Sequence, residues 1–126
     1  MLSLIVLLAA CGTKDVVVSS EFPGCENYDP DHPPKETLEA VEDGLNWNVV
    51  HYGVFEACSA TFEPEIQLDG RSIDVREVWT GGEDDTCTSC FTPMITIKDP
   101  PKGKYEVYWY TDDGDVPWDN VSFKVE

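Results

Sequence analysis

The chain has 126 residues, with 25 acidic side chains against 8 basic ones, so its formal charge is −17. A chain of this length forms one domain with one hydrophobic core, and its 41% apolar content is above that of a disordered chain. A surface this acidic excludes binding to nucleic acids or to anionic lipids by charge, because both are polyanions.

Residues 1–10 have features of a secretory signal peptide. Residues 2–10 form an apolar run that ends in small residues; it is too short for a bilayer, which needs about 20 apolar residues, but typical of a signal-peptide core. Leu8-Ala9-Ala10-Cys11 resembles the lipobox of bacterial lipoproteins. The resemblance implies cleavage before Cys11 and acylation of that cysteine, so that the protein is attached to a membrane through its lipid. The other interpretation of the run is a buried amino-terminal strand.

The residues around this motif bear on location. In Gram-negative lipoproteins an aspartate after the lipidated cysteine commonly retains the protein at the inner membrane, and this chain has Gly12 there. The resemblance therefore implies a lipid-anchored place in the cell envelope, with the outer membrane favoured in a Gram-negative cell. Met1-Leu2-Ser3 departs from the pattern because it lacks Lys or Arg, which points to a translation start a few residues upstream.

Residues 11–36 are predicted to form an acidic, proline-rich tether between the lipid and the domain. The segment from Asp29 to Pro34 contains three prolines, so it can form neither a helix interior nor a central strand. His32 lies in this segment and is interpreted as a solvated side chain.

The domain is predicted to span residues 37–126 and to begin with a short helix. Residues 36–43 fit a helix that ends at Gly44, because Leu38 and Val41 have the spacing of one helical face.

From residue 47 onward the hydrophobic pattern has a period of two, which is typical of β-strands. The predicted strands lie at residues 47–52, 66–68, 73–79, 94–98, 105–109 and 121–125. Asp69-Gly70 is a strong hairpin signal, because both residues tolerate a positive φ. Roughly six or seven short strands with at most one short helix predict an all-β fold, an antiparallel β-sandwich that is Ig-like in the loose sense.

Several motifs resemble those of known sandwich domains. Gly103-Lys104-Tyr105-Glu106-Val107 looks like the G-x-Y-x-V element of late strands in bacterial Ig-like and transthyretin-like sandwiches. Residues 49–110 resemble a group of small exported bacterial domains without assigned function. The matching features are His51 ahead of Cys58, Ile73-Asp74-Val75-Arg76-Glu77, the Cys87/Cys90 cluster and the G-x-Y-x-V element. The resemblance implies the fold and export, and it carries no known activity.

Apart from Cys11, the chain has an even number of cysteines, which in an exported domain indicates two disulfides. They are Cys25, Cys58, Cys87 and Cys90. Four cysteines allow three pairings, and the sequence does not choose among them. Long-range pairings are favoured over Cys87–Cys90, because longer loops constrain the unfolded chain more.

Metal binding is the alternative for the same cysteines, since thiolates and imidazole suit zinc or copper(I). The weak candidate ligands are His51, Cys58, Cys87 and Cys90. A redox-active Cys87–Cys90 pair is a further alternative, although the carboxylates before it would raise a thiol pKa. Otherwise His51 is interpreted as a strand histidine with one hydrogen bond.

Two acidic loops offer oxygen ligands for calcium. They are Glu83-Asp84-Asp85 and Asp112-Asp113-Gly114-Asp115. Neither has the spacing of a known calcium loop, so solvated turns are the alternative interpretation.

Aromatic residues are the candidates for contact with a partner. Tyr108 and Tyr110 alternate with Trp109, which is expected in the core, and Trp118 follows Pro117 in a predicted loop. Tyr108, Tyr110 and Trp118 are therefore the predicted surface-contact residues, for an envelope protein or a glycan.

No catalytic residue is predicted, because the sequence has no nucleophile elbow, phosphate loop or metalloprotease motif. We expect a non-catalytic, lipid-anchored binding or structural module of the bacterial envelope, without a cofactor and without a nucleic-acid partner. Two alternatives stay open: a metal- or carbohydrate-binding lipoprotein, and an envelope hydrolase or redox protein. A concave pocket with converging polar groups favours a ligand-binding protein, and a perturbed titratable group inside it favours an enzyme.

Overall fold

The computed structural model of the protein describes residues 4–8, 16–26 and 28–126. The described residues form 13 β-strands and no helix, which confirms the predicted all-β class. Accordingly, no helix in these ranges has the length and hydropathy of a membrane span. Ala9-Ala10-Cys11, which contains the predicted cleavage site, lies outside the described residues.

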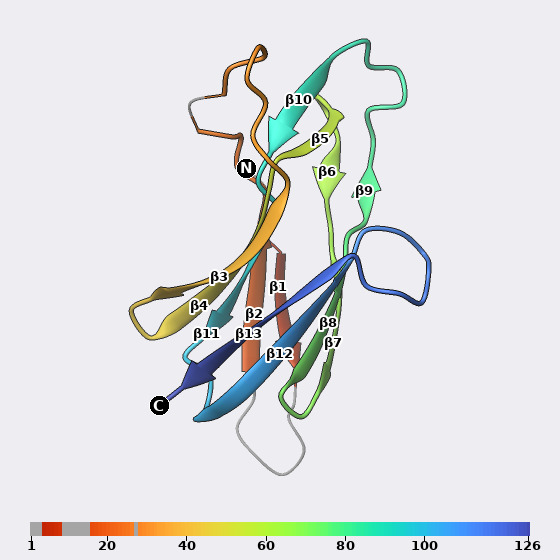
Figure 1. Ribbon diagram of the computed structural model, residues 1–126. Helices are drawn as coiled ribbons and strands as arrows, with labels where there is room; N and C mark the ends of the chain where they lie inside the picture. The colour runs from red at the N-terminus through yellow and green to blue at the C-terminus, as the bar shows by residue number, and fades with distance from the viewer. Residues whose placement is uncertain (1–3, 9–15, 27) are drawn as a thin grey trace.

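Two larger sheets face each other as the layers of a sandwich (Figure 1). The first has the order β1-β2-β11-β4-β3 and only antiparallel pairs. Its strands are β1 (Leu4–Leu8), β2 (Val16–Glu21), β3 (Thr37–Asp43), β4 (Asn46–Tyr52) and β11 (Met94–Lys98). The second has the order β13-β12-β8-β7. Its strands are β7 (Glu65–Asp69), β8 (Ser72–Arg76), β12 (Gly103–Tyr110) and β13 (Asp119–Val125).

Two short ribbons extend from one end of the sandwich (Figure 1). One pairs β10 (Thr88–Phe91) with β5 (Val54–Ala57), and the other pairs β6 (Thr61–Phe62) with β9 (Trp79–Thr80). Residues 78 and 79 were predicted to continue the strand from residue 73, but β8 ends at Arg76 and Trp79 pairs in β9 instead.

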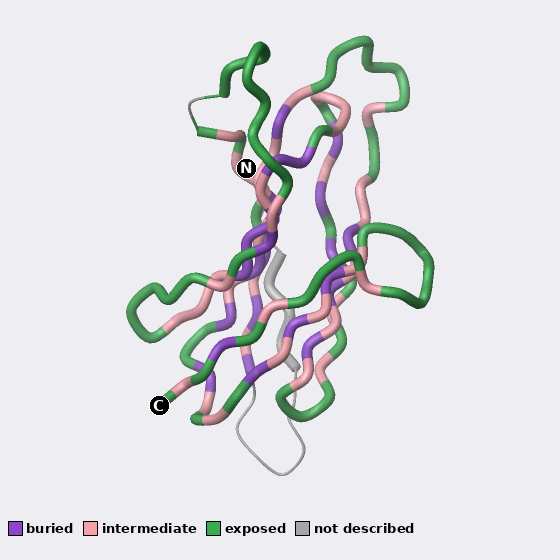
Figure 2. Tube along the Cα trace, in the orientation of Figure 1, coloured by how far each residue is buried: buried purple, intermediate pink, exposed green. Residues whose placement is uncertain are grey.

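The core lies between the two larger sheets, where Figure 2 shows the buried positions of the facing strands. In β12, Tyr105, Val107 and Trp109 are at most 2% exposed, as the period of two predicts. The Tyr105 ring stacks on Phe123 at 5.0 Å between centroids, and its hydroxyl donates to the Pro101 carbonyl over 2.7 Å. A hydroxyl bond to backbone just upstream also fixes the tyrosine corner of Ig-like sandwiches.

The predicted hairpin between residues 66–68 and 73–75 is present, but its two-residue turn is Gly70-Arg71, because Asp69 is the last residue of β7 and pairs with Ser72. Strands β7 and β8 pair antiparallel from Glu65 with Arg76 to Asp69 with Ser72, and Gly70 has a φ of +63°. A positive φ at the turn matches the right-handed twist of the flanking strands.

Residues 36–43 do not form the predicted helix. Residues 37–43 form β3, which pairs with β4 from Thr37 with Tyr52 onward. Leu38 is 7% exposed and Val41 is 41% exposed, so the two side chains lie on opposite faces of the sheet. Gly44, with a φ of +63°, closes a hairpin and does not end a helix. Strand pairing therefore overrides the weak helical spacing.

The predicted tether also differs from the structure. Val16–Glu21 forms β2, and Val16 and Val18 are 3% and 0% exposed. Burial of the apolar valines in the core is more favourable than their exposure to solvent. The prolines that suggested a tether all follow the strand. His32 is exposed, as predicted, and its Nδ1 atom lies 3.0 Å from Asp29 Oδ2.

One strand pair is parallel, unlike the antiparallel sandwich that the sequence predicts. Strands β8 and β12 run in the same direction, with Ile73 opposite Val107 and Val75 opposite Trp109. Between them the chain crosses to the first sheet and forms β11, so no hairpin constrains their relative direction.

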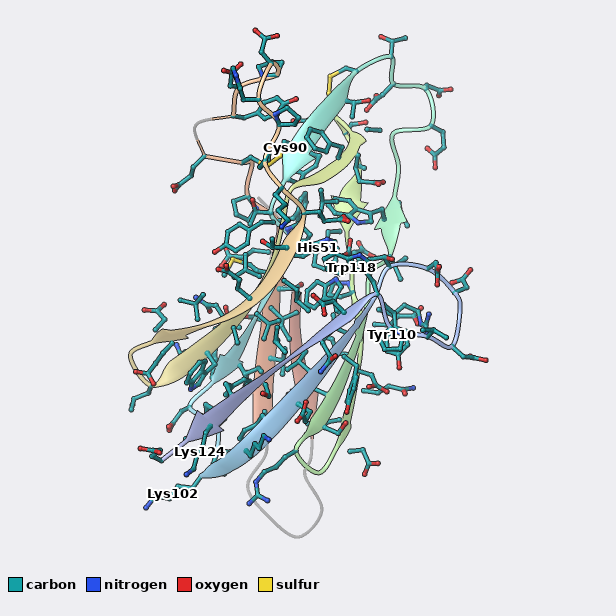
Figure 3. The ribbon with its side chains drawn as sticks, in the orientation of Figure 1. His51, Cys90, Lys102, Tyr110, Trp118 and Lys124 are labelled. Atoms are coloured by element: carbon teal, nitrogen blue, oxygen red, sulfur yellow. A yellow bond between two sulfur atoms is a disulfide. The ribbon has the colours of Figure 1, made fainter. Side chains whose placement is uncertain are left out.

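One end of the sandwich gathers basic side chains. Lys98 lies opposite Val17 at the start of β2, Arg71 donates to the Lys102 carbonyl, and Lys104 lies opposite Lys124. Figure 3 shows Lys102 and Lys124 near each other at this end. Five of the chain's 8 basic residues therefore lie at the end where β2 begins.

Candidate functional site

A groove lies on the outer face of the first sheet. Strand register places Asn48, Val50 and Met94 on this face, since Met94 lies opposite Val50. The groove has a volume of about 450 Å³, within the range of small-molecule sites. Its lining residues are Pro23, Gly24, Cys25, Glu26, Pro34, Val41, Asn48, Val50, Tyr52, Gly53, Thr92 and Met94.

One wall of the groove is residues 23–26, which are fixed to the strand that leads into β11. Cys25 forms a disulfide with Cys90, and its N–H donates to the Cys90 carbonyl over 3.2 Å. The Thr92 N–H donates to the Pro23 carbonyl over 2.8 Å. A wall held by a covalent bond and two backbone hydrogen bonds is in place before a ligand binds, so binding costs little ordering entropy.

The opposite wall depends on a glycine. Gly53 has a φ of +76°, and a Cβ atom there would lie 3.0 Å from the Lys35 carbonyl oxygen and 3.1 Å from that of Pro34. The missing side chain therefore lets the segment with Pro34 approach the end of β4 and close the groove.

The groove combines an apolar floor with a phenol and carboxylates. Burial raises the pKa of Tyr52, and the carboxylates of Glu39 and Glu26 raise it further. Glu26 lines the groove, and Glu39 lies opposite Val50 and therefore on the same face of the sheet. Tyr52 stays protonated at neutral pH, so it offers a hydroxyl and an aromatic face beside negative charge.

A buried polar cluster lies on the other face of β4. His51 is 1% exposed, its Nδ1 atom contacts Glu77 Oε2, and its Nε2 atom lies 3.2 Å from Glu36 Oε2. His51 therefore has two carboxylate partners, where the sequence predicted one hydrogen bond. Burial raises the pKa of nearby Glu56, and the Glu77 carboxylate raises it further.

Glu77 is the centre of this cluster. It accepts hydrogen bonds from the indole N–H of Trp109 and, over 2.9 Å, from that of Trp79. His51 belongs to the first sheet and Trp109 to the second, so the carboxylate joins the two layers. Within the described residues, every buried side-chain polar atom has a partner.

Trp118 covers His51. Their ring centroids are 4.4 Å apart, and Figure 3 shows the two residues together between the sandwich and its extension. Trp118 remains 36% exposed. A satisfied and covered cluster stabilises the fold and leaves His51 without access to a substrate.

The two predicted disulfides are present, and both are long-range. Cys25 pairs with Cys90 and Cys58 with Cys87, at sequence separations of 65 and 29. These bonds occupy the sulfurs of the proposed metal ligands Cys58, Cys87 and Cys90 and do not bring them to His51. Among the described residues, no three His, Cys, Asp or Glu side chains form a group suited to a metal ion.

The acidic loops are held by hydrogen bonds within the protein. Asp85 Oδ2 accepts from the N–H and the hydroxyl of Ser59, each over 2.7 Å, and these bonds lower the pKa of Asp85. Arg76 donates to the carbonyls of Asp112 and Gly114. The Arg76 guanidinium therefore fixes two backbone carbonyls of the second loop.

The predicted surface-contact residues do not gather at the groove. Tyr108 and Tyr110 are half-buried on the outer face of the second sheet, opposite Asp74 and Arg76. The Arg76 guanidinium lies 4.6 Å from the centre of the Tyr110 ring, where a cation–π contact forms. The groove is on the outer face of the other sheet, so the structure separates these tyrosines from it.

Comparisons of the chain with protein-family models, with curated proteins and with solved structures gave no match.

Proposed function

We propose that the protein is a non-catalytic binding module, anchored in the bacterial cell envelope through a lipid on Cys11, and that the groove holds its ligand. The observation that supports this best is the groove itself, with a volume of about 450 Å³, an apolar floor and a fixed wall. The ligand is a small organic cation, an ammonium group on an apolar body.

The charges beside the groove support a cationic ligand. Glu26 and Glu39 both act on the Tyr52 phenol, so an ammonium group next to that ring has two carboxylates to neutralise. The ring face attracts a cation as well. The apolar part of the ligand then covers Val50 and Met94, which lie side by side on the floor.

The same groups favour binding over catalysis. A phenol that acts as a general base or a nucleophile needs its pKa lowered towards neutrality, and the pKa of Tyr52 is raised. The hydroxyl is therefore a hydrogen-bonding group for a ligand. His51, the residue best suited to acid–base chemistry, is buried below Trp118.

Benzylamine, with benzyl alcohol as its neutral isostere, tests the ligand class by calorimetry or NMR. We expect the ammonium to bind about two- to thirtyfold more tightly than the alcohol, since ion pairs and cation–π contacts add about 0.5–2 kcal/mol. Glu26→Gln and Glu39→Gln should each weaken benzylamine binding. Glu126→Gln removes the same charge away from the groove and should leave the affinity unchanged.

Three results decide this prediction. Equal binding of the alcohol, or an equal loss in Glu126→Gln, contradicts a specific ammonium site, because the overall charge of −17 then explains the attraction. If N-acetylglucosamine binds without displacing benzylamine or benzyl alcohol, the protein has a carbohydrate site on a surface other than the groove. Binding of the ammonium that Tyr52→Phe weakens supports the groove.

The lipid anchor has its own test. We expect the full chain, expressed in a bacterium with labelled palmitate, to carry the label and to sediment with membranes. Cys11→Ala should abolish both, since it removes the acylated sulfur. Thr13→Ala is the control, which leaves Cys11 and both disulfides in place. Labelling that survives Cys11→Ala argues against the anchor and leaves the groove untouched.

A further inference from the structure

In the structure β1 closes one edge of the first sheet. Leu4–Leu8 pair antiparallel with β2, from Leu4 opposite Ser20 to Leu8 opposite Val16. The same five residues belong to the apolar run of the proposed signal peptide. Cleavage before Cys11, on which this inference rests, removes β1 and makes β2 the edge strand.

The other long edge strands carry charges. Strand β3 has Glu39, Glu42 and Asp43, β7 has Glu65 and Asp69, and β13 has Asp119 and Lys124. Charged side chains on an edge strand oppose the addition of another strand. The sequence of β2 is Val-Val-Val-Ser-Ser-Glu, with no charge before its last residue. Among the larger sheets, the edge that cleavage opens is therefore the unprotected one.

The rest of β2 stays in place after cleavage. On its other side it pairs with β11 from Val17 opposite Lys98 to Glu21 opposite Met94. Val16 and Val18 point into the core and are 3% and 0% exposed while β1 is present. Removal of β1 leaves these valines beside a row of unpaired backbone groups, which is a rigid template for a new strand.

We propose that the processed protein binds an extended, uncharged, apolar segment of a partner protein by adding it antiparallel to β2. The pairing of β1 with β2 shows the arrangement: five consecutive apolar residues in continuous register. Main-chain hydrogen bonds supply affinity, and side chains on alternating faces supply specificity. A second copy is disfavoured, because residues 1–10 hold no charge and each processed chain keeps the formal charge of −17.

The test uses the full chain expressed in a bacterial envelope and purified in detergent as the processed lipoprotein. Mass spectrometry first establishes whether residues 1–10 are absent. The probe is a peptide of residues 3–9 followed by two lysines, and the control is the same peptide with Val6→Pro. Proline removes an N–H and disfavours a continuous strand pair while it keeps the charge.

Hydrogen exchange of the backbone amides is the readout. With the probe at about ten times its Kd, we expect those amides of residues 16–21 that face the free edge, not β11, to exchange about tenfold more slowly, because the probe then covers most of them. The proline peptide should slow them by less than about twofold. Residues 37–43 of β3, at the opposite edge of the same sheet, should not change with either peptide.

Other outcomes overturn the proposal. Unchanged exchange in β2, equal slowing by both peptides, or equal slowing in β3 excludes specific strand addition. Retention of residues 1–10 means that β1 closes the edge permanently. Protection of β2 without peptide in a dimeric sample assigns the edge to a second copy. Benzylamine binding is measured on the same sample, so failure at this edge is distinguishable from failure of the groove.

Discussion

Replacement of Glu77 by leucine is expected to lower the free energy of unfolding by about 3–5 kcal/mol. The carboxylate accepts from the indoles of Trp79 and Trp109 and contacts Nδ1 of His51. Leucine has a similar volume but no acceptor, so two indole donors lose their partner between the two sheets and His51 loses one of its two carboxylates. Each unsatisfied buried donor costs about 1–3 kcal/mol.

Urea unfolding followed by tryptophan fluorescence measures this loss. Glu83→Leu is the control, because it removes the same charge from an exposed loop position, and we expect a change below about 0.5 kcal/mol there. Glu77→Gln should fall between the two, since the amide keeps one oxygen acceptor. A loss below about 1 kcal/mol in Glu77→Leu would show that the cluster does not join the sheets.

Removal of the Cys25–Cys90 disulfide is expected to cost about 4 kcal/mol and to weaken ligand binding at the groove. The bond closes a loop with a sequence separation of 65, and loop-closure entropy gives about 4 kcal/mol for that length. Cys25→Ala/Cys90→Ala also frees the wall of residues 23–26, which must then be ordered when a ligand binds.

Cys58→Ala/Cys87→Ala is the matched control. Its sequence separation is 29, which gives about 3.5 kcal/mol, and the bond lies in the extension away from the groove. We expect both double variants to unfold at lower urea, but only the first to bind benzylamine less tightly. Equal affinity in the two variants would mean that the disulfide does not shape the groove.

Local pattern and turn chemistry were enough to predict much of the second sheet. The hairpin between β7 and β8 and the alternation in β12 and β13 depend on neighbouring residues, so the sequence contains the necessary information. Strand β3 was missed because the spacing of Leu38 and Val41 fits a helix, and only pairing with β4 decides between the two. Strand β2 was not predicted, because the prolines that follow it led us to assign the whole segment to a tether.

The candidate sites were harder to predict, because they join distant segments. Glu77 is 26 residues from His51 and is one of 25 acidic residues. One signal was present: Ile73, Val75 and Glu77 alternate, so the carboxylate falls on the inward face. The groove is lined by Tyr52, Met94 and residues 23–26. These residues are far apart in the sequence, so no local sequence pattern predicts that they lie together.

Under the proposed lipid anchor, the early start of β2 would limit the distance between the domain and the membrane. Only residues 12–15 would separate a lipid on Cys11 from the start of β2. At full extension these four residues span at most about 14 Å. The proposed anchor would therefore place the basic end of the sandwich, with Lys98 opposite Val17, next to the headgroups. Glu21 ends β2 beside Met94, roughly 13 Å along the strand from Val17. The proposed anchor would thus leave the groove on the aqueous side, where a dissolved ligand would reach it without crossing the lipid.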